Sequence, residues 1–169
     1  GGGVAQAALR ICKQRGARVW VTSSSPEKLA AAEALGADVL INHATEDVGK
    51  LIRERTSKRG VDVVIESVGE RTWNASLQSL TRGGRLVTCG GTSGPSLSMD
   101  VRRLFWYQWS IMGSTMGNDA EFEAVTAELA AGRLWPTVDA VLPLADGREA
   151  FARMQRGEQF GKLVLRVSE

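Results

Sequence analysis

The residues with the most evident chemical capacity stand at the start of the chain, where Gly1, Gly2 and Gly3 are followed by Val4 and Ala5. Glycines let backbone N–H groups approach a phosphate without a Cβ in the way, and the N-terminus of a following helix attracts negative charge. This segment has the form of the last part of a glycine-rich turn that holds the pyrophosphate of a dinucleotide. Composition alone leaves open that the three glycines are only a linker.

A second group of candidates follows the β-branched run 18–22. Ser23 and Ser24 come directly after this run, and Lys28 lies in the helical segment beyond it. A dinucleotide fold that selects NAD places Asp or Glu here to bind the ribose 2′-hydroxyl, and no carboxylate precedes Glu27. Because hydroxyls and a positive charge suit a 2′-phosphate, the sequence favours NADP(H) over NAD(H). The alternative is that Lys28 is a solvated helix residue.

Such candidates need elements that bring them to one edge of a sheet. Apolar spacing with its start and stop signals predicts helices over 4–15, 25–36, 46–57, 73–80 and 120–131, and strands over 18–22, 39–42, 61–66, 85–89 and 110–114. Another strand-like segment, a short helix and a terminal strand follow over 138–144, 148–154 and 162–167. This alternation indicates βαβ units, so the predicted fold class is α/β with a doubly wound, Rossmann-like parallel sheet.

The first strand of such a fold precedes the glycine-rich turn and lies at the centre of the sheet, bonded on both sides. Since the chain begins with the turn, we expect this strand to be missing from the chain and the native protein to extend upstream. Each buried backbone group left unpaired would cost roughly 1–3 kcal/mol. Either a gap between strands or another segment in the place of the first strand is therefore expected.

The composition excludes several other classes of protein. Hydrophobic residues make up 43% and charged residues 24%, and 21 basic against 19 acidic residues leave a net charge of +2. No apolar run approaches the ~20 residues of a membrane span, and the interspersed charges argue against a nucleic-acid surface. Cys12 and Cys89 are far apart and match no zinc spacing, so we expect no metal and a reducing, cytoplasmic setting.

Alternative chemistries fit the residues poorly. The pairs Gly49-Lys50 and Gly161-Lys162 are followed by Leu, whereas a phosphate-binding P-loop needs Ser or Thr. Tyr107 is the only tyrosine, and Ile111 stands where a short-chain dehydrogenase would need Lys. His43 is the only histidine, and we expect it at the surface or beside an adenine ring rather than in catalysis. The sequence assigns no catalytic residue.

Several segments together resemble the medium-chain dehydrogenase/reductase superfamily. They are Gly1–Ala5, Val21–Ser25, Leu35–Asp38, Gly60–Val64, Gly83–Val87 and Gly161–Leu165. The chain is similar to the coenzyme domain of zinc-type alcohol dehydrogenases and of zinc-free quinone oxidoreductases. The resemblance implies that residues 1–137 are a dinucleotide-binding domain lacking its first strand, and that residues 138–169 return to a catalytic domain absent from this chain.

The resemblance also implies which residues bind the coenzyme. The turn with Gly2, Gly3 and Val4 would hold the pyrophosphate, and Ser23, Ser24 and Lys28 the adenosine ribose. Ser67, Val68 and Gly69 would line the coenzyme cleft. Cys89, Gly90 and Gly91, with Gly113, Ser114 and Thr115, would border the nicotinamide, and the backbone at Lys162 would close the cleft. The glycines at strand ends could equally be tight turns, a reading that does not conflict with ligand binding there.

The implied activity is hydride transfer between NADPH and a carbonyl, alkene or quinone, with negligible turnover by this chain alone. A non-catalytic nucleotide-binding or redox-sensing module is the alternative. The resemblance further implies a homodimer through the edge strand Ser110–Ser114, with Phe105, Trp106 and Trp109 as anchors. These aromatic residues could instead pack under the preceding loop.

Overall fold

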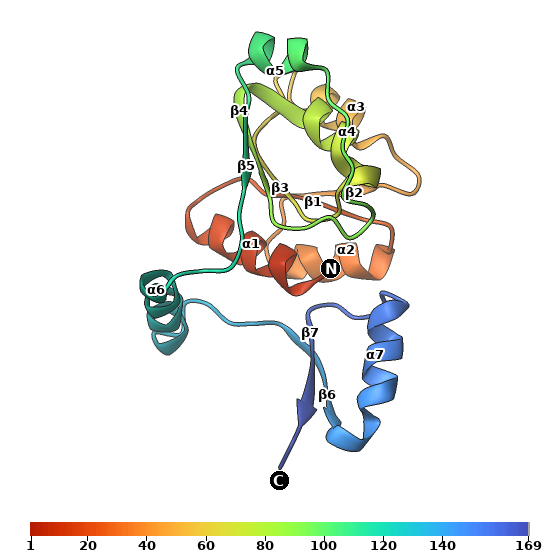
Figure 1. The fold of residues 1–169 in the computed structure, drawn as a ribbon, viewed down its shortest axis with the longest axis vertical. Coiled ribbons are helices and arrows are strands. Elements are labelled where there is room, and N and C mark those ends of the chain that lie inside the picture. The colour runs from red at the N-terminus through yellow and green to blue at the C-terminus, as the bar shows by residue number, and fades with distance from the viewer. Residues whose placement is uncertain (169) are drawn as a thin grey trace. The chain divides into compact units, whose positions relative to one another are not determined.

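The computed structural model describes residues 1–168, which form two compact units. Unit 1 comprises residues 1–42 and the chain from Asn118 onward, and unit 2 comprises His43–Gly117. Every paired strand runs parallel to its neighbour and the strands alternate with helices, as Figure 1 shows. The predicted α/β class is therefore confirmed.

The first part of unit 1 is a short βαβ arrangement. It contains α1 (Gly3–Gln14), β1 (Trp20–Ser23), α2 (Pro26–Ala34) and β2 (Val39–Asn42), with Trp20 opposite Val39 in the parallel pair. Helix α2 begins as predicted, because the Ser25 hydroxyl accepts the Lys28 N–H at 3.2 Å and Pro26 occupies the first helical position. Buried Leu9, Ala32 and Ala37 join these elements.

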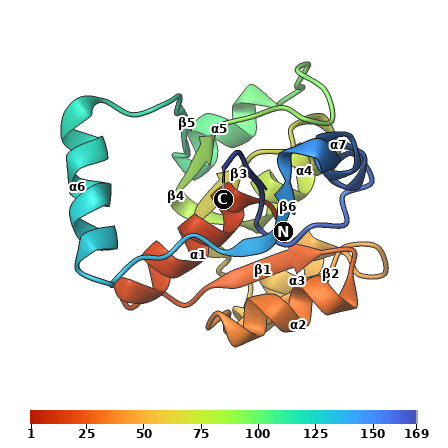
Figure 2. The same ribbon diagram turned by 90° about the horizontal axis from the view of Figure 1, so that it is seen from below.

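The second part of unit 1 contains α6 (Asp119–Ala130), β6 (Val138–Pro143), a short 3-10 turn η1 (Leu144–Asp146), α7 (Gly147–Gln155) and β7 (Lys162–Arg166). Helix α7 runs alongside the parallel pair β6–β7 in Figure 1, and Figure 2 shows α6 standing clear of α2 and α7. The start of the chain contacts the segment just before β7 within this unit. Gly2 and Gly161 form a parallel bridge, and the Gly161 N–H donates to the Gly1 carbonyl at 2.9 Å.

Unit 2 is a three-stranded parallel sheet with helices. It contains α3 (Val48–Arg55), β3 (Val61–Glu66), α4 (Glu70–Ser79), β4 (Leu80–Thr88), α5 (Val101–Tyr107) and β5 (Ser110–Gly113), in the strand order β3-β4-β5. The register places Val64, Leu86 and Ile111 side by side across the sheet. This row faces the core formed by Trp73, Leu77, Leu80, Leu86 and Trp109.

The strands of the predicted sheet are divided between sheets. Strand β1 is hydrogen-bonded to β2 alone and β3 to β4 alone, so among the described residues no strand pairs with both β1 and β3. The expected gap at the place of the first strand stays a prediction. None of the described helices is both long and apolar enough to span a bilayer.

The segment around residues 100–109 differs from the sequence prediction. Residues 101–107 form helix α5, which the sequence analysis did not predict, and the Asp100 side chain caps it by accepting the Arg102 N–H at 2.9 Å. Trp109 was predicted as an anchor of a dimer interface, but the structure buries it within unit 2. The ring is only 6% exposed, stacks on Tyr107 with 5.0 Å between centroids, and donates its indole N–H to the Thr81 carbonyl at 2.9 Å.

Candidate functional site

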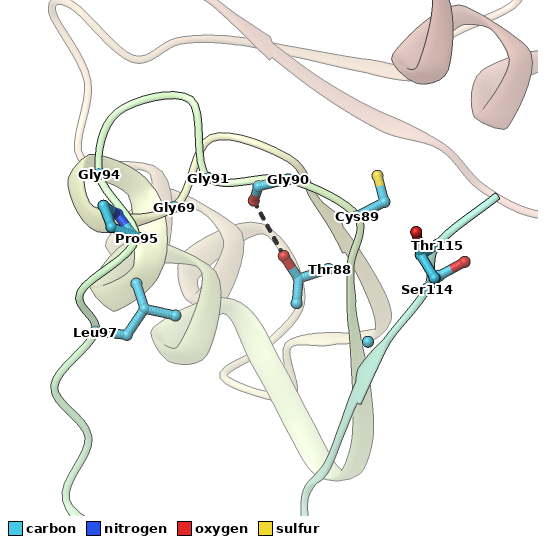
Figure 3. Close-up of a pocket in the computed structure, with 11 residues that line it drawn as sticks. Gly69, Thr88, Cys89, Gly90, Gly91, Gly94, Pro95, Leu97, Ser114 and Thr115 are labelled. Carbon is cyan, nitrogen blue, oxygen red and sulfur yellow. Dashed lines mark hydrogen bonds between the residues drawn. The ribbon is translucent and has the colours of Figure 1, made fainter.

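A pocket of about 470 Å³ lies in unit 2 at the carboxyl ends of β3, β4 and β5 (Figure 3). It is lined by Gly69, Thr88, Cys89, Gly90, Gly91, Gly94, Pro95, Leu97, Gly113, Ser114 and Thr115. In an open parallel α/β sheet, ligands bind at this end of the strands. The pocket collects seven of the residues that the sequence analysis proposed for the coenzyme, from three separate segments.

The glycines of the pocket allow backbone segments to come closer than side chains would permit. Gly69 has a φ of +89°, and a Cβ on it would lie 2.6 Å from the Gly94 carbonyl oxygen and 3.0 Å from the Gly91 Cα. A Cβ on Gly90 would lie 2.9 Å from the Ser67 carbonyl oxygen. Any larger residue would push these segments apart, so this part of the pocket wall consists of bare backbone.

Polar groups stand at the ends of the two adjacent strands. The Thr88 hydroxyl donates to the Gly90 carbonyl at 3.2 Å, and the Ser114 N–H donates to the Thr88 carbonyl at 2.8 Å. In Figure 3, the Cys89 thiol and the side chains of Ser114 and Thr115 project from neighbouring strand ends. All three side chains are exposed, so the pocket offers hydroxyl, thiol and backbone groups together with the apolar Pro95 and Leu97.

Ser67 and Val68 lie behind this wall rather than in the lining. The Ser67 carbonyl is 3.5 Å from the Thr92 hydroxyl that donates to it. The Val68 carbonyl accepts two hydrogen bonds from Ser93, one from the backbone N–H and one from the hydroxyl, both at 2.7 Å. These two predicted residues therefore hold the loop 90–95 in place, while Gly69 contacts the cavity itself.

Sequence reasoning missed Glu66, a buried carboxylate at the end of β3. One of its oxygens accepts the N–H groups of Val68 at 2.6 Å and Gly69 at 3.2 Å, and the other accepts the hydroxyls of Thr72 at 2.8 Å and Ser76 at 2.6 Å. Burial opposes ionisation of this carboxyl, but the hydrogen bonds, led by that of Ser76, outweigh it and lower its pKa. An acidic residue ending an apolar strand was the available signal.

The glycine turn of unit 1 opens helix α1. Gly2 is the N-cap without a side-chain hydrogen bond, and the first N–H groups of a helix have no partner inside it. A Cβ on Gly2 would meet nothing within 4 Å, whereas a Cβ on Gly3 would lie 2.6 Å from the Lys162 Cε. Lys162 therefore lies against the start of α1, and the buried Gln6 side chain fixes the turn by donating to the Gly1 carbonyl at 2.9 Å.

The predicted ribose-binding residues differ in exposure. Ser23 is buried, and its hydroxyl accepts the Ser25 N–H at 3.2 Å, so it shapes the turn. Ser24 is exposed. The Lys28 ammonium donates to the Gly157 carbonyl, and a Cβ on Gly1 would lie 3.0 Å from the Lys28 Cδ. Lys28 therefore passes beside the glycine turn, as a residue that binds an anion near this turn would.

The described residues offer no obvious metal site. Within residues 1–168, no group of three or more His, Cys, Asp or Glu side chains could hold an ion. His43 follows β2 and is exposed. The turn at α1 leaves backbone N–H groups open to an anion, and the lining of the pocket in unit 2 includes five glycines.

Comparison with known proteins identifies the family of this chain. Residues 3–131 match the sequence profile of the family described as zinc-binding dehydrogenase. The chain belongs to this family. The match begins at Gly3 and covers the whole of unit 2, which confirms the resemblance to the medium-chain dehydrogenase/reductase superfamily.

Individual alcohol dehydrogenases are also similar to this chain. The chain is 31% identical over 169 residues to an alcohol dehydrogenase of Geobacillus stearothermophilus, covering 99% of this chain and 49% of that protein. It is 32% identical over 171 residues to an NAD-dependent alcohol dehydrogenase of Sulfolobus acidocaldarius, covering 99% and 48%. A crystal structure of an NAD-dependent alcohol dehydrogenase matches with a TM-score of 0.91 at 35% identity, covering 99% and 49%. The chain thus spans about half the length of these relatives.

Proposed function

We propose that this chain is the coenzyme-binding part of an NADP(H)-dependent oxidoreductase that transfers hydride to or from a carbonyl, alkene or quinone. The observation that carries the proposal is the pocket at the carboxyl ends of β3, β4 and β5, whose wall is glycine backbone in part. A flat aromatic ring can approach such a wall closely. The names of the relatives, which are alcohol dehydrogenases, support an oxidoreductase role.

Each unit has its own group of proposed coenzyme contacts. In unit 1 the N–H groups at Gly2, Gly3 and Val4 would bind the pyrophosphate, with Lys162 beside them. In unit 2 the pocket glycines with Cys89, Ser114 and Thr115 would border the nicotinamide. The coenzyme, when bound, supplies the hydride, while the residues of this chain bind and orient it.

The preference for NADP(H) rests on residues after β1. Ser24 is exposed and Lys28 brings a positive charge beside the glycine turn, while Asp and Glu are missing from positions 22–26. A carboxylate there would repel a 2′-phosphate, whereas hydroxyl and ammonium donors would bind it. Both the Sulfolobus acidocaldarius relative and the similar crystal structure are named as NAD-dependent, so the proposed preference for NADP(H) depends on this chain's own residues.

Fluorescence titration of the chain with NADPH and NADH tests the proposal. We expect saturable binding of both, tighter for NADPH, and negligible oxidation of NADPH when carbonyl or quinone acceptors are added to this chain alone. If neither coenzyme binds, the proposed function fails. If NADH binds more tightly, only the coenzyme preference fails.

We also propose that the chain forms a homodimer through the outer edge of β5. That strand pairs with β4 and with no other strand among the described residues, and an open apolar edge is an aggregation hazard. Phe105 and Trp106 on the adjoining helix α5 are each 65% exposed and supply apolar area next to this edge. The partner would be a second copy of this chain, related by a two-fold axis.

Sedimentation velocity tests the dimer. The unmodified chain should sediment as a dimer that dissociates on dilution, and Trp106→Glu should shift it to monomer. Phe122→Glu is the matched control, because Phe122 is an exposed aromatic residue of α6, in unit 1. A chain that is monomeric at every concentration, or equal shifts in both variants, would contradict the proposal.

A further inference from the structure

Glu66 is a buried charge that does not line the pocket and yet contacts the segments that do. Its side chain is placed in the interior, with the residue only 4% exposed. The four donors to its carboxylate, two backbone N–H groups and two hydroxyls, come from the Val68–Gly69 turn and from α4. A carboxylate is an acceptor with room for four such donors, so every donor that points at it is satisfied.

The main chain of Glu66 binds the segment at Cys89, another part of the pocket lining. Its carbonyl accepts the Cys89 N–H at 3.1 Å and lies 3.7 Å from the Cys89 sulfur. One residue therefore fixes the Gly69 side of the pocket through its side chain and the Cys89 side through its backbone. Both of these neighbours line the cavity.

The loop 90–95 is attached to the same turn. Ser93 donates twice to the Val68 carbonyl, and its hydroxyl accepts the Arg71 N–H at 3.0 Å, while the Gly94 carbonyl accepts the Glu70 N–H at 3.4 Å. The first N–H groups of α4 are thus capped by this loop, since Gly69 at the N-cap has no side chain to do so. Displacing the Val68–Gly69 turn would displace the loop with it.

We infer that Glu66 is the positioning residue of the coenzyme pocket, which its ionised carboxylate assembles by holding the Val68–Gly69 turn in place. The inference deepens the proposed function and rests on it for the identity of the ligand. Glu66 is not a catalytic residue, because its carboxylate faces the turn and α4 rather than the cavity.

The charge state follows from the surroundings. The donors to the carboxylate are all uncharged. The segments that contact Glu66 also carry the titratable side chains of Cys89, after β4, and of Glu70 and Arg71, at the start of α4. The lowered pKa of the Glu66 carboxyl keeps it ionised at neutral pH. Protonation would turn one acceptor into a donor facing other donors, which the turn could not accommodate unchanged.

The test compares Glu66→Gln with Asp62→Asn. Asp62 is a matched control, since it lies on the same strand and its exposed carboxylate pairs with Arg59 at 2.5 Å, away from the pocket. Proton NMR would follow the amide signals of Val68 and Gly69 through a pH titration, together with their hydrogen exchange. NADPH affinity would be measured by fluorescence on the same samples.

In the unmodified chain both amide protons should titrate together, with a midpoint below the ordinary pKa of glutamate, because both donate to the same carboxylate. Glu66→Gln should abolish this titration, accelerate exchange at Gly69, and weaken NADPH binding roughly tenfold, the scale of one charge-assisted hydrogen bond. Asp62→Asn should leave all three measurements unchanged. Unchanged amide signals and affinity in Glu66→Gln would overturn the inference.

The experiment distinguishes a failure of the proposed function from a failure of this inference. If the unmodified chain binds no coenzyme, the proposed function fails, and the amide titration still decides whether Glu66 positions the turn. If Glu66→Gln does not fold, Ser76→Ala removes a single donor and should raise the titration midpoint seen at Val68 and Gly69. A midpoint that does not move in Ser76→Ala would overturn the inference.

Discussion

At the scale of single residues, a substitution of Lys28 tests the proposed preference for a 2′-phosphate. Replacing it with Ala should weaken NADPH binding by roughly tenfold, the scale of one charged hydrogen bond, and leave NADH binding nearly unchanged. Lys50→Ala is the control, because Lys50 lies on α3 in unit 2 and is largely exposed. If Lys28→Ala weakens the binding of NADPH and NADH equally, Lys28 does not bind the 2′-phosphate.

Gly69 tests whether the pocket wall depends on close backbone approach. Gly69→Ala should destabilise the chain by about 1–3 kcal/mol or more, because the φ of +89° is strained for alanine and the new Cβ would meet the Gly94 carbonyl. Gly83→Ala is the control. Gly83 also has a positive φ, +69°, but a Cβ there would meet nothing within 4 Å, so only about 1–2 kcal/mol of backbone strain is expected.

Urea unfolding measures both variants, and NADPH titration measures what remains of the pocket. The gap between the two free energies reports the steric part of the effect, since both positions share a positive φ. If Gly83→Ala costs as much as Gly69→Ala, the close approach of Gly69 to the loop 90–95 does not matter to stability.

At the scale of elements, the packing of α5 and β5 on β4 depends on Trp109. Trp109→Phe keeps an aromatic ring against Tyr107 but removes the indole N–H that reaches the Thr81 carbonyl. We expect a loss of about 1–3 kcal/mol, the cost of a buried group left without its partner. Trp106→Phe, at an exposed position on α5, should change the free energy of unfolding of the monomer little.

Thermal or urea unfolding at high dilution would give both values. The expectation fails if Trp109→Phe leaves the free energy of unfolding unchanged and Trp106→Phe lowers it. Trp106 would then be the buried residue of this segment and Trp109 the exposed one. That result would return Trp109 to the interface predicted from the sequence.

At the scale of the whole molecule, carboxyl groups with lowered pKa values set the response to acid. The hydrogen bonds from Lys13 and Arg59 lower the pKa of Asp38 and of Asp62, and the network around Glu66 lowers its pKa despite burial. A group with a lowered pKa in the folded state binds fewer protons there than when unfolded. Its stabilisation is complete above the unfolded pKa of about 4 and is lost as the pH falls through the folded value.

Stability should therefore stay level from pH 7 to about pH 5 and fall below that. The midpoints of urea unfolding, measured from pH 7 to pH 3, test this expectation. Glu66→Gln should be less stable than the unmodified chain at pH 7, and the difference should narrow toward pH 3 as the native carboxyl becomes protonated. A difference that is constant over this range would exclude ionisation of Glu66 as the cause.

Much of the architecture could be predicted from the sequence, because its signals are local. Three features are each decided by neighbouring residues: the Ser25-Pro26 start of α2, the alternation of apolar strands with helices, and the glycines after β4 and at the end of β5. Seven of the proposed coenzyme residues line one pocket because parallel strands end at the same edge of a sheet. Their binding role itself stays a prediction.

Other features were decided only by tertiary structure, since they depend on residues far apart in the chain. Trp109 reads as a surface aromatic until Thr81, 28 residues earlier, receives its N–H. Glu66 reads as the polar end of a strand until the turn and α4 converge on it. Composition and spacing thus determined the fold class and the edge where a ligand would bind. Which side chains are buried, and which one holds the wall of the pocket, was determined by long-range hydrogen bonds that no local pattern encodes.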